Sequence, residues 1–296
     1  MTRRDFLRFA LAAPIALRAG QVFAHQSPQN EDYFTGKDVF AKLMAEAKEK
    51  DWKKLPMGEL VGTIGLTFVG TPYVAHTFEI FDDKEVCVIN LAGLDCATFY
   101  EASLALARTI KGGRLTDSEF KKQITRIRYR DGRLKGYVSR LHYASDYFFD
   151  NDKKGTVKLI TQDLPGAEVF THPVGFMSKN PDKYRQLNAN PDLVPEIAKT
   201  EAEINARKNY FLPTARVADA EQLLKTGDIV GLTTTMEGLD CSHTGMCYRD
   251  KEGVLRFLHA SSAKSVMQVT LGPRLSDYLK NSKVNDGLMV VRPLEL

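Results

Sequence analysis

The stretch GLDCATFYEASLALAR, residues 93–108, places a cysteine directly behind an aspartate at the start of a helical pattern. Asp95 is a residue type that caps helix N-termini, so Cys96 falls in the first turn. A glycine pair at 112–113 supplies the expected end, and a short apolar run of strand length, EVCVINL at 85–91, precedes the helix. The apolar positions recur at helical spacing along one face: Phe99, Ala102, Leu106 and Ile110.

Cys96 is one of four cysteines in the chain, and its position favours reactivity. The positive end of a helix dipole and its free N–H groups lower the pKa of a thiol from ~8.5 to about 3.5–7.5. We therefore predict that Cys96 is a thiolate nucleophile. The alternative is an inert packing residue, because most cysteines in apolar surroundings are of that kind.

Two histidines on neighbouring predicted strands strengthen the case for a nucleophile. Side-chain alternation in CSHTGMCYR, residues 241–249, predicts Cys241, His243, Gly245 and Cys247 on one face. The turn DKEG joins this strand to the one that carries His259, so the two imidazoles are expected to be neighbours. A thiolate needs a base, and the base needs a group that fixes its tautomer. For His243 alone, an ordinary core histidine is an equal alternative.

A zinc site is the main chemical alternative, because Cys241, His243 and Cys247 offer three ligands within a short segment. In an extended strand the two cysteines lie about 20 Å apart at ~3.3 Å per residue. That separation argues against an ion shared by the two cysteines, which leaves zinc as the weaker alternative, and it excludes a disulfide between them within one extended strand. We expect neither a metal nor a cofactor.

The pattern of elements predicts an α+β fold with helices packed on one face of an antiparallel sheet. Strands are expected from residue 228 to the C-terminus, and helices mostly before it. Residues 61–74, rich in Gly and Thr, are expected to be irregular or extended. Residues 128–215 are expected to form a large insertion, between the Cys96 helix and the sheet, in a single domain of residues 25–296. Further helices are predicted at 38–50, 117–127, 139–151 and 191–207, and a strand at 156–164.

Residues 1–24 are typical of an export signal rather than of a folded element. Arg3 and Arg4 precede an apolar run at 9–17, and a small-residue exit follows at 22–24. The segment resembles a twin-arginine signal, which predicts a periplasmic protein. About nine apolar residues are too few for a membrane anchor, which needs ~20. The alternative is a basic N-terminus that arises by chance.

The composition is that of an ordinary globular protein, with 43% hydrophobic and 26% charged residues. The net charge is only +4, and lysines and arginines are interspersed with acids. No basic tract therefore indicates a nucleic-acid partner. The sequence gives no prediction of oligomeric state.

Five ordered motifs resemble the N-acetylmuramoyl-L-alanine amidase-like family, a branch of the papain-like, NlpC-type cell-wall cysteine hydrolases. The resemblance covers most of the chain after residue 25. The motifs are GTPYVAHTFE at 70–79, GLDCATFYE at 93–101, residues 128–151, residues 224–246, and LHASS at 258–262.

The resemblance implies a papain-like core and a catalytic triad of Cys96, His243 and His259. It implies cleavage of the amide between N-acetylmuramic acid, often in its anhydro form, and L-alanine in peptidoglycan fragments. It also points to Tyr73 as a wall of the site near the oxyanion position. NlpC-type peptidases commonly carry Asp-Cys-Ser, whose first two positions hold a free amine. Here Asp95 is retained as a substrate contact, but Ala97 replaces the serine, which is consistent with an acylated nitrogen or with neutral packing.

The segment SRLHYASDY, residues 139–147, is interpreted as part of the substrate groove. Arg140 is expected to pair with a peptide carboxylate, and three further side chains to line a groove for sugar or stem peptide. A simple amphipathic helix with a solvated arginine is an equal alternative. The three further residues are His142, Tyr143 and Tyr147.

Two other functions fit the same motifs. One is a γ-D-glutamyl cell-wall endopeptidase of the same clan, and the other is a non-catalytic protein that binds muropeptides. The complete proposed triad argues against the second. We predict a cysteine amidase whose partners are soluble muropeptides.

Overall fold

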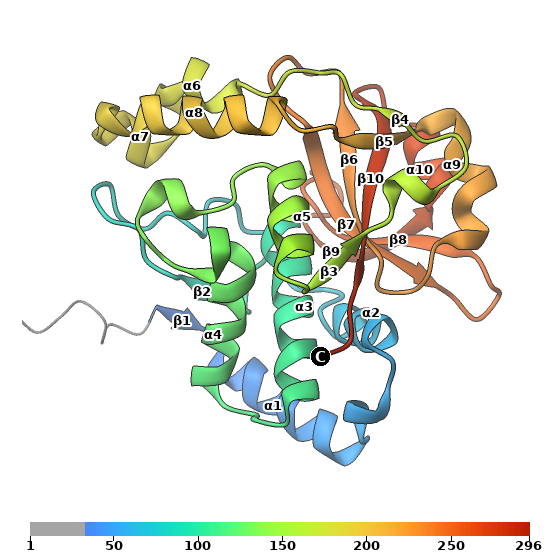
Figure 1. Cartoon of the computed structure of the whole chain (residues 1–296). Coiled ribbons are helices and arrows are strands. Elements are labelled where there is room, and N and C mark those ends of the chain that lie inside the picture. Colours follow the sequence, from blue (N-terminus) through green and yellow to red (C-terminus); the bar gives the residue numbers. More distant parts are fainter. Residues whose placement is uncertain (1–32) are drawn as a thin grey trace, which may run out of the picture. The chain divides into compact units, whose positions relative to one another are not determined.

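Helix α3 (Cys96–Gly112) is buried along almost its whole length, from Thr98 to Ile110. Asp95 caps its N-terminus, and Gly113, with a φ of 74°, ends it. Both boundaries confirm the predicted helix. The computed structural model describes residues 33–296, and they form one compact unit (Figure 1).

An eight-stranded sheet packs against α3, and all of its pairings are antiparallel. The main strand order is β4-β5-β10-β6-β7-β8-β9, with β3 paired to β10. The C-terminal strand thus lies inside the sheet rather than at its edge. The strands are β3 (Val157–Leu159), β4 (Glu168–Val169), β5 (Tyr210–Pro213), β6 (Ile229–Thr234), β7 (Cys241–Arg249), β8 (Leu255–Ser261), β9 (Gln268–Arg274) and β10 (Asn285–Pro293).

Helices cover both faces of the sheet, which corrects the prediction of helices on one face only. The first face packs with α2 (Met57–Thr67) and α3 in the largest hydrophobic cluster. The second face packs with α9 (Thr214–Ala220) and α10 (Leu275–Lys280) in a separate cluster. Helices of seven and six residues are too short to give a helical repeat in the sequence, which explains why they were missed.

The prediction for residues 61–74 is wrong in its first half, because α2 extends to Thr67. Its glycines allow a close approach to the sheet. A Cβ on Gly62 would lie 2.3 Å from Thr226 Cγ2, and one on Gly65 would lie 2.9 Å from Met246 Sδ. Tertiary packing therefore overrides the low helix propensity of glycine.

The insertion at 128–215 is not separate from the sheet, since it supplies β3, β4 and β5. Its helix α5 (Ala144–Lys153) begins five residues later than predicted, after a short 3₁₀ turn at 137–139 and an extended segment. Its remaining helices pack in a third hydrophobic cluster. They are α6 (Phe176–Lys179), α7 (Arg185–Ala189) and α8 (Val194–Asn205).

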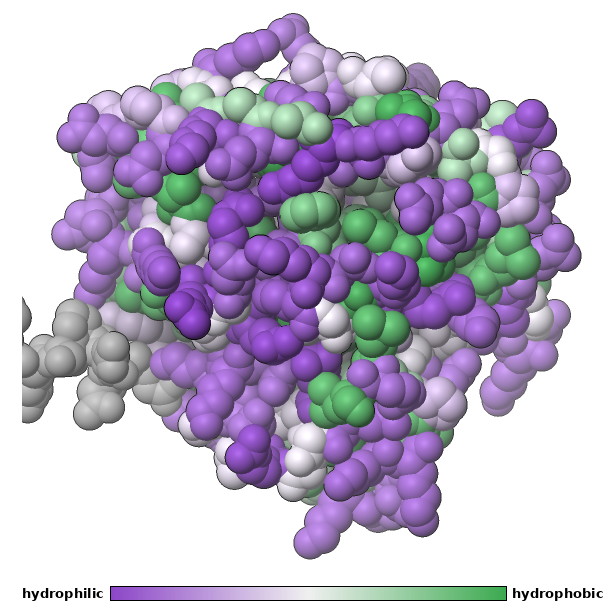
Figure 2. Space-filling view, in the orientation of Figure 1, coloured by the Kyte–Doolittle hydropathy of each residue, from purple (hydrophilic) through white to green (hydrophobic). Residues whose placement is uncertain are grey.

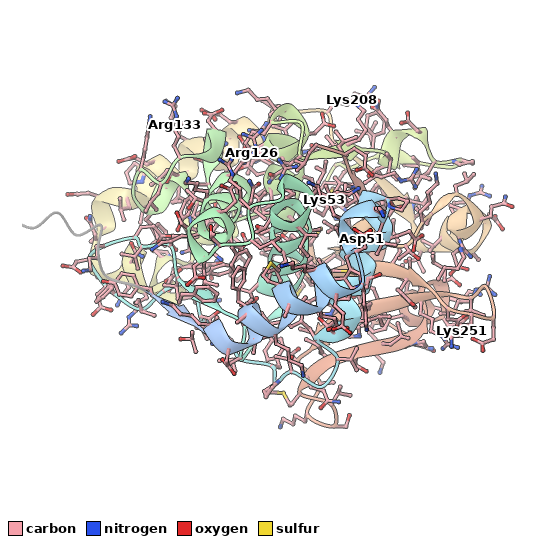
Figure 3. The ribbon with its side chains drawn as sticks, turned by 90° about the horizontal axis from the view of Figure 1, so that it is seen from below. Asp51, Lys53, Arg126, Arg133, Lys208 and Lys251 are labelled. Atoms are coloured by element: carbon pink, nitrogen blue, oxygen red, sulfur yellow. The ribbon has the colours of Figure 1, made fainter. Side chains whose placement is uncertain are left out.

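The N-terminal part of the unit lies beneath α3. Figure 3 shows α1 (Lys37–Glu49) in front, followed by Asp51 and Lys53, with Lys251 in the DKEG turn between β7 and β8. Helix α4 (Asp117–Arg128) begins at the predicted residue, and the Thr116 hydroxyl caps it by accepting the N–H of Glu119. The predicted strand at 85–91 shortens to β2 (Ile89–Asn90), which pairs in parallel with β1 (Phe34–Thr35).

Hydrophilic residues cover most of the face in Figure 2, and the hydrophobic ones gather in small groups. Within residues 33–296, no helix combines the length and the hydropathy needed to cross a bilayer. The predicted signal at 1–24 lies outside the described residues.

Candidate active site

A cavity of about 470 Å³ opens at the N-terminus of α3. The start of α3, the segment before α5, the start of β7 and the insertion all contribute to its walls. Seven of the nine site residues expected from the sequence line it. These are Asp95, Cys96, Arg140, His142, Tyr143, Tyr147 and His243.

The backbone at Cys96 is fixed by a reciprocal cap. Asp95 Oδ1 accepts the N–H of Thr98 at 2.7 Å and its hydroxyl at 2.8 Å, while the Thr98 hydroxyl accepts the N–H of Asp95 at 2.8 Å. This arrangement holds the first turn of α3 rigidly and leaves the half-buried Cys96 on the cavity.

The pKa of Cys96 contradicts the predicted thiolate. Burial, and then the neighbouring Asp95 carboxylate, raise it to about 11, although hydrogen bonds from Thr244 and from the backbone of Ala97 lower it. The helix dipole was expected to dominate, but desolvation of the sulfur is the larger effect. The resting side chain is therefore a neutral thiol at pH 7.

The two histidines are hydrogen-bonded to each other, which confirms that they are neighbours. His243 Nε2 lies 2.8 Å from His259 Nδ1, and the rings are nearly perpendicular, at 87°. His259 is only 3% exposed and does not line the cavity, so it lies behind His243. Phe257 and Tyr278 pack against both rings and restrict their rotation.

Both imidazoles are neutral in the resting site. Burial lowers the pKa of His243 to about 4. Burial, and then the proximity of His243, lower the pKa of His259 to about 3. Because a bond between two neutral imidazoles needs one donor and one acceptor, a proton on His243 Nε2 leaves its Nδ1 free to accept.

The prediction that four residues of β7 share one face is confirmed for His243, Gly245 and Cys247 and is wrong for Cys241. The β6–β7 register shifts there, since Leu232 pairs with His243 but Thr233 pairs with Cys241. This bulge places Cys241 in the first hydrophobic cluster, whereas Cys247 belongs to the second, on the opposite face of the sheet. No group of three metal-ligating side chains occurs in the described part of the chain.

Tyr73 does not line the cavity but lies close to it. An isolated bridge pairs it with Leu94, next to the α3 cap. Burial, and then the charges of Cys96 and Asp95, raise the pKa of the Tyr73 hydroxyl to about 12. The phenol therefore lies within electrostatic range of Cys96 and Asp95.

Arg140 lines the cavity, but its charge is already paired with carboxylates of the protein. Its Nη2 lies 2.5 Å from Glu79 Oε1, and its Nε lies 3.1 Å from Glu85 Oε1. The guanidinium also packs over the ring of Tyr137 and is only 7% exposed. Both glutamates lie more than 50 residues earlier in the chain, so a local motif could not indicate the pairing.

The other groove residues are held mainly by the protein itself. Tyr143 donates its hydroxyl proton to Glu201 Oε1 at 2.7 Å. His142 Nε2 bonds the carbonyl of Tyr137 at 3.0 Å, and burial lowers the pKa of His142 well below its ordinary range. Tyr147 packs edge-on against Tyr100. These side chains shape the cavity wall.

A sequence profile of the N-acetylmuramoyl-L-alanine amidase-like family matches residues 63–288. The chain belongs to this family. The match confirms the resemblance to the amidase-like family and spans both the α3 cap and the histidine pair.

Solved structures agree with the family. An N-acetylmuramoyl-L-alanine amidase from Bacteroides uniformis is 34% identical, with a TM-score of 0.74, over 80% of this chain and 99% of that one. A Bacteroides fragilis protein provisionally named a xylanase is 38% identical, with a TM-score of 0.71, over 78% of this chain and 99% of that one. A Legionella pneumophila protein at 19% identity, with a TM-score of 0.63 over 87% and 95%, shares the fold. No protein with a curated description matches.

Several residues of this amidase-like site escaped the sequence analysis. Asp240 is 2% exposed and accepts the N–H groups of Ser145 and Cys241, both at 2.6 Å, so it joins α5 to β7. The feature of the sequence that could have indicated this role is the position of Asp240 directly before a predicted strand. The others are Glu101, Arg128, Lys183 and Thr244, which line the cavity, and Tyr278, which flanks the histidines.

Proposed function

We propose that this member of the amidase-like family is a cysteine amidase with a papain-like, NlpC-type core. It hydrolyses the amide between N-acetylmuramic acid, including the anhydro form, and L-alanine in peptidoglycan fragments. The observation that carries the proposal is the cavity that Cys96 and His243 share, with His259 hydrogen-bonded behind His243.

The acylation step begins from a neutral pair. As Sγ of Cys96 attacks the lactyl carbonyl, the thiol proton passes to His243, and the carbonyl oxygen becomes an oxyanion. His243 then gives this proton to the alanine nitrogen as the C–N bond breaks, which leaves a thioester and a peptide with a free amino terminus. Backbone N–H groups at the start of α3 and the nearby Tyr73 hydroxyl are suited to stabilise the oxyanion.

Deacylation uses the same groups in reverse. His243 removes a proton from water, the hydroxide attacks the thioester, and Cys96 leaves as a thiol after His243 returns the proton. The muramic acid carboxylate is released. His259 serves as the positioning residue, because its Nδ1 accepts the Nε2 proton of His243 and so presents Nδ1 of His243 to the sulfur.

We further propose that the protein works outside the cytoplasm, in the periplasm. The arginine pair and apolar run within residues 1–24 support export by the twin-arginine route. After removal of the signal, residues 25–296 would form the single catalytic domain. The family's link to the cell wall supports this location.

The decisive experiment is mass spectrometry of the products from one defined muropeptide. Wild-type protein should release an intact stem peptide beginning with L-alanine, and Cys96→Ala should release none. Cys87→Ala is the matched control, because this thiol is buried outside the cavity. Cleavage after the γ-D-glutamyl residue, or full activity in Cys96→Ala, would refute the assignment.

A further inference from the structure

Four cationic side chains line the cavity, and two of them are buried within ion pairs of the protein. Arg128 donates from Nε and Nη2 to Oε2 of Glu101, at 2.9 and 2.6 Å. Arg140 is paired with Glu79 and Glu85. Because each charge is already compensated in a desolvated place, neither arginine can exchange its partner for a ligand without exposing a buried carboxylate.

The other two cations, Lys183 and Arg185, are exposed, and only one of them has an acidic partner. Arg185 forms an ion pair with Asp82. Lys183 Nζ donates to Asn180 Oδ1 at 2.9 Å and lies 4.8 Å from the centre of the Phe176 ring. No carboxylate within residues 33–296 pairs with Lys183, and the contacts to a neutral amide and a ring leave its charge uncompensated.

The remaining carboxylates of the cavity are bonded elsewhere and form no ion pair with Lys183. Asp95 is committed through Oδ1 to the α3 cap, and Asp240 to two backbone N–H groups. His142 and His243 are neutral, because burial lowers the pKa of each. Lys183 is therefore the cation in this cavity best placed to bind an anion brought by the ligand.

We propose that Lys183 is a specificity-determining residue that binds a carboxylate on the peptide part of the substrate. It takes the role that the sequence suggested for Arg140. The inference rests on the proposed amidase function and deepens it. Lys183 belongs to the insertion, at the end of the 3₁₀ turn Pro181–Lys183, whereas Cys96 and His243 come from α3 and β7. The reacting groups and the anion-binding group are thus on different parts of the chain.

The test compares defined muropeptides in which each peptide carboxylate is replaced, one at a time, by a carboxamide. Wild-type protein should show a KM roughly fivefold higher for one of these amides, the size of one partly exposed ion pair, with little change in kcat. Lys183→Gln should remove this preference, and Lys183→Arg should keep it. The preference should also weaken at high ionic strength, in wild type and in Lys183→Arg alike.

Lys179→Gln is the matched control, because Lys179 is an exposed lysine of the neighbouring α6 that pairs with Glu237 and does not line the cavity. It should keep the wild-type preference. Equal discrimination by wild type and Lys183→Gln would overturn the proposal, as would loss of discrimination in the control.

Binding to the Cys96→Ala variant separates the two proposals. Titration calorimetry with the same ligands should show weaker binding of the sensitive amide, and Lys183→Gln added to this variant should abolish the difference. If the difference is present but wild type cleaves nothing, the inference stands and the amidase function fails. If wild type cleaves all ligands alike, the inference fails alone. Absence of both binding and cleavage overturns both.

Discussion

Two groups of buried side chains at the cavity differ in charge: one is neutral and the other is ionic. The neutral group (Cys96, His243 and His259) contains three titratable side chains that desolvation keeps uncharged at pH 7. The ionic group (Glu79, Glu85, Glu101, Arg128 and Arg140) contains charges held in close pairs. Both groups are buried. They differ in charge because only the side chains of the ionic group have a partner of opposite charge close enough to form an ion pair.

The two groups therefore suit different roles: the neutral group suits catalysis, and the ionic group suits holding the cavity in shape. A neutral thiol and a neutral imidazole can exchange one proton during attack without an ion pair that must be broken first. Paired charges instead fix the positions of segments far apart in sequence, because each partner is costly to leave alone. The cavity therefore has one region suited to moving a proton and another suited to holding its shape.

The largest expected effect comes from breaking the neutral group. His243→Gln should lower kcat/KM by about 10²–10⁴-fold, because the proton acceptor for the Cys96 thiol is lost. The fold should persist, as judged by circular dichroism. His172→Gln, a half-buried histidine outside the cavity, is the control and should keep its activity. An active His243→Gln would exclude general-base catalysis by this residue.

Breaking the ionic group should instead lower stability. Glu101→Gln leaves Arg128 buried without its partner, and each is at most 4% exposed in the wild type. The free energy of unfolding, measured in urea, should fall by about 3–5 kcal/mol. Replacing both residues, as Glu101→Gln with Arg128→Met, should recover part of the loss. No change in the single variant would mean that the pair is not desolvated.

A smaller effect is expected in the dependence of stability on pH. The pKa of His259 is near 3 in the folded chain and near 6.5 when unfolded, so the unfolded state binds the extra proton below pH 6.5. Its contribution to stability is complete above pH 6.5 and decreases by about 1.4 kcal/mol per pH unit as the pH falls toward 3. His259→Gln should unfold with a shallower pH slope in urea titrations between pH 6.5 and 4. An unchanged slope would contradict the neutral pair.

The smallest effect concerns the cap beside the sulfur. Asp95→Asn retains a capping side chain but removes the carboxylate charge that raises the pKa of Cys96. The pH at which Cys96 becomes reactive toward iodoacetamide should therefore move below that of the wild type. The measurement is best made in a Cys241→Ser background, because Cys241 is the other partly exposed cysteine and also lines the cavity. A shift to higher pH would show that the carboxylate does not act on the thiol through its charge.

The features predicted well from the sequence are those fixed by neighbouring residues. The α3 boundaries follow from Asp95 and the glycine after the helix, and the DKEG turn sets the two histidine strands side by side. A cap and a tight turn each depend on a few consecutive residues. Local sequence therefore identified both the cysteine and the imidazole pair.

The features that were missed depend on contacts between distant segments. The neutral thiol arises from burial, which a helix position alone does not reveal. Arg140 loses its free charge to Glu79 and Glu85, and the bulge at Cys241 arises from the pairing with Thr233. The α2 glycines look unfavourable for a helix until the close contact with the sheet is known.

The place of β10 inside the sheet has a consequence for synthesis. This strand, residues 285–293, is synthesised after β3, β5 and β6, yet it separates β5 from β6 and also pairs with β3. Until residues 285–293 have left the ribosome, those three strands lack their shared partner and expose unpaired hydrogen-bonding edges. The sheet therefore cannot be completed before this strand emerges, and a deletion of residues 285–293 alone should leave an aggregating chain.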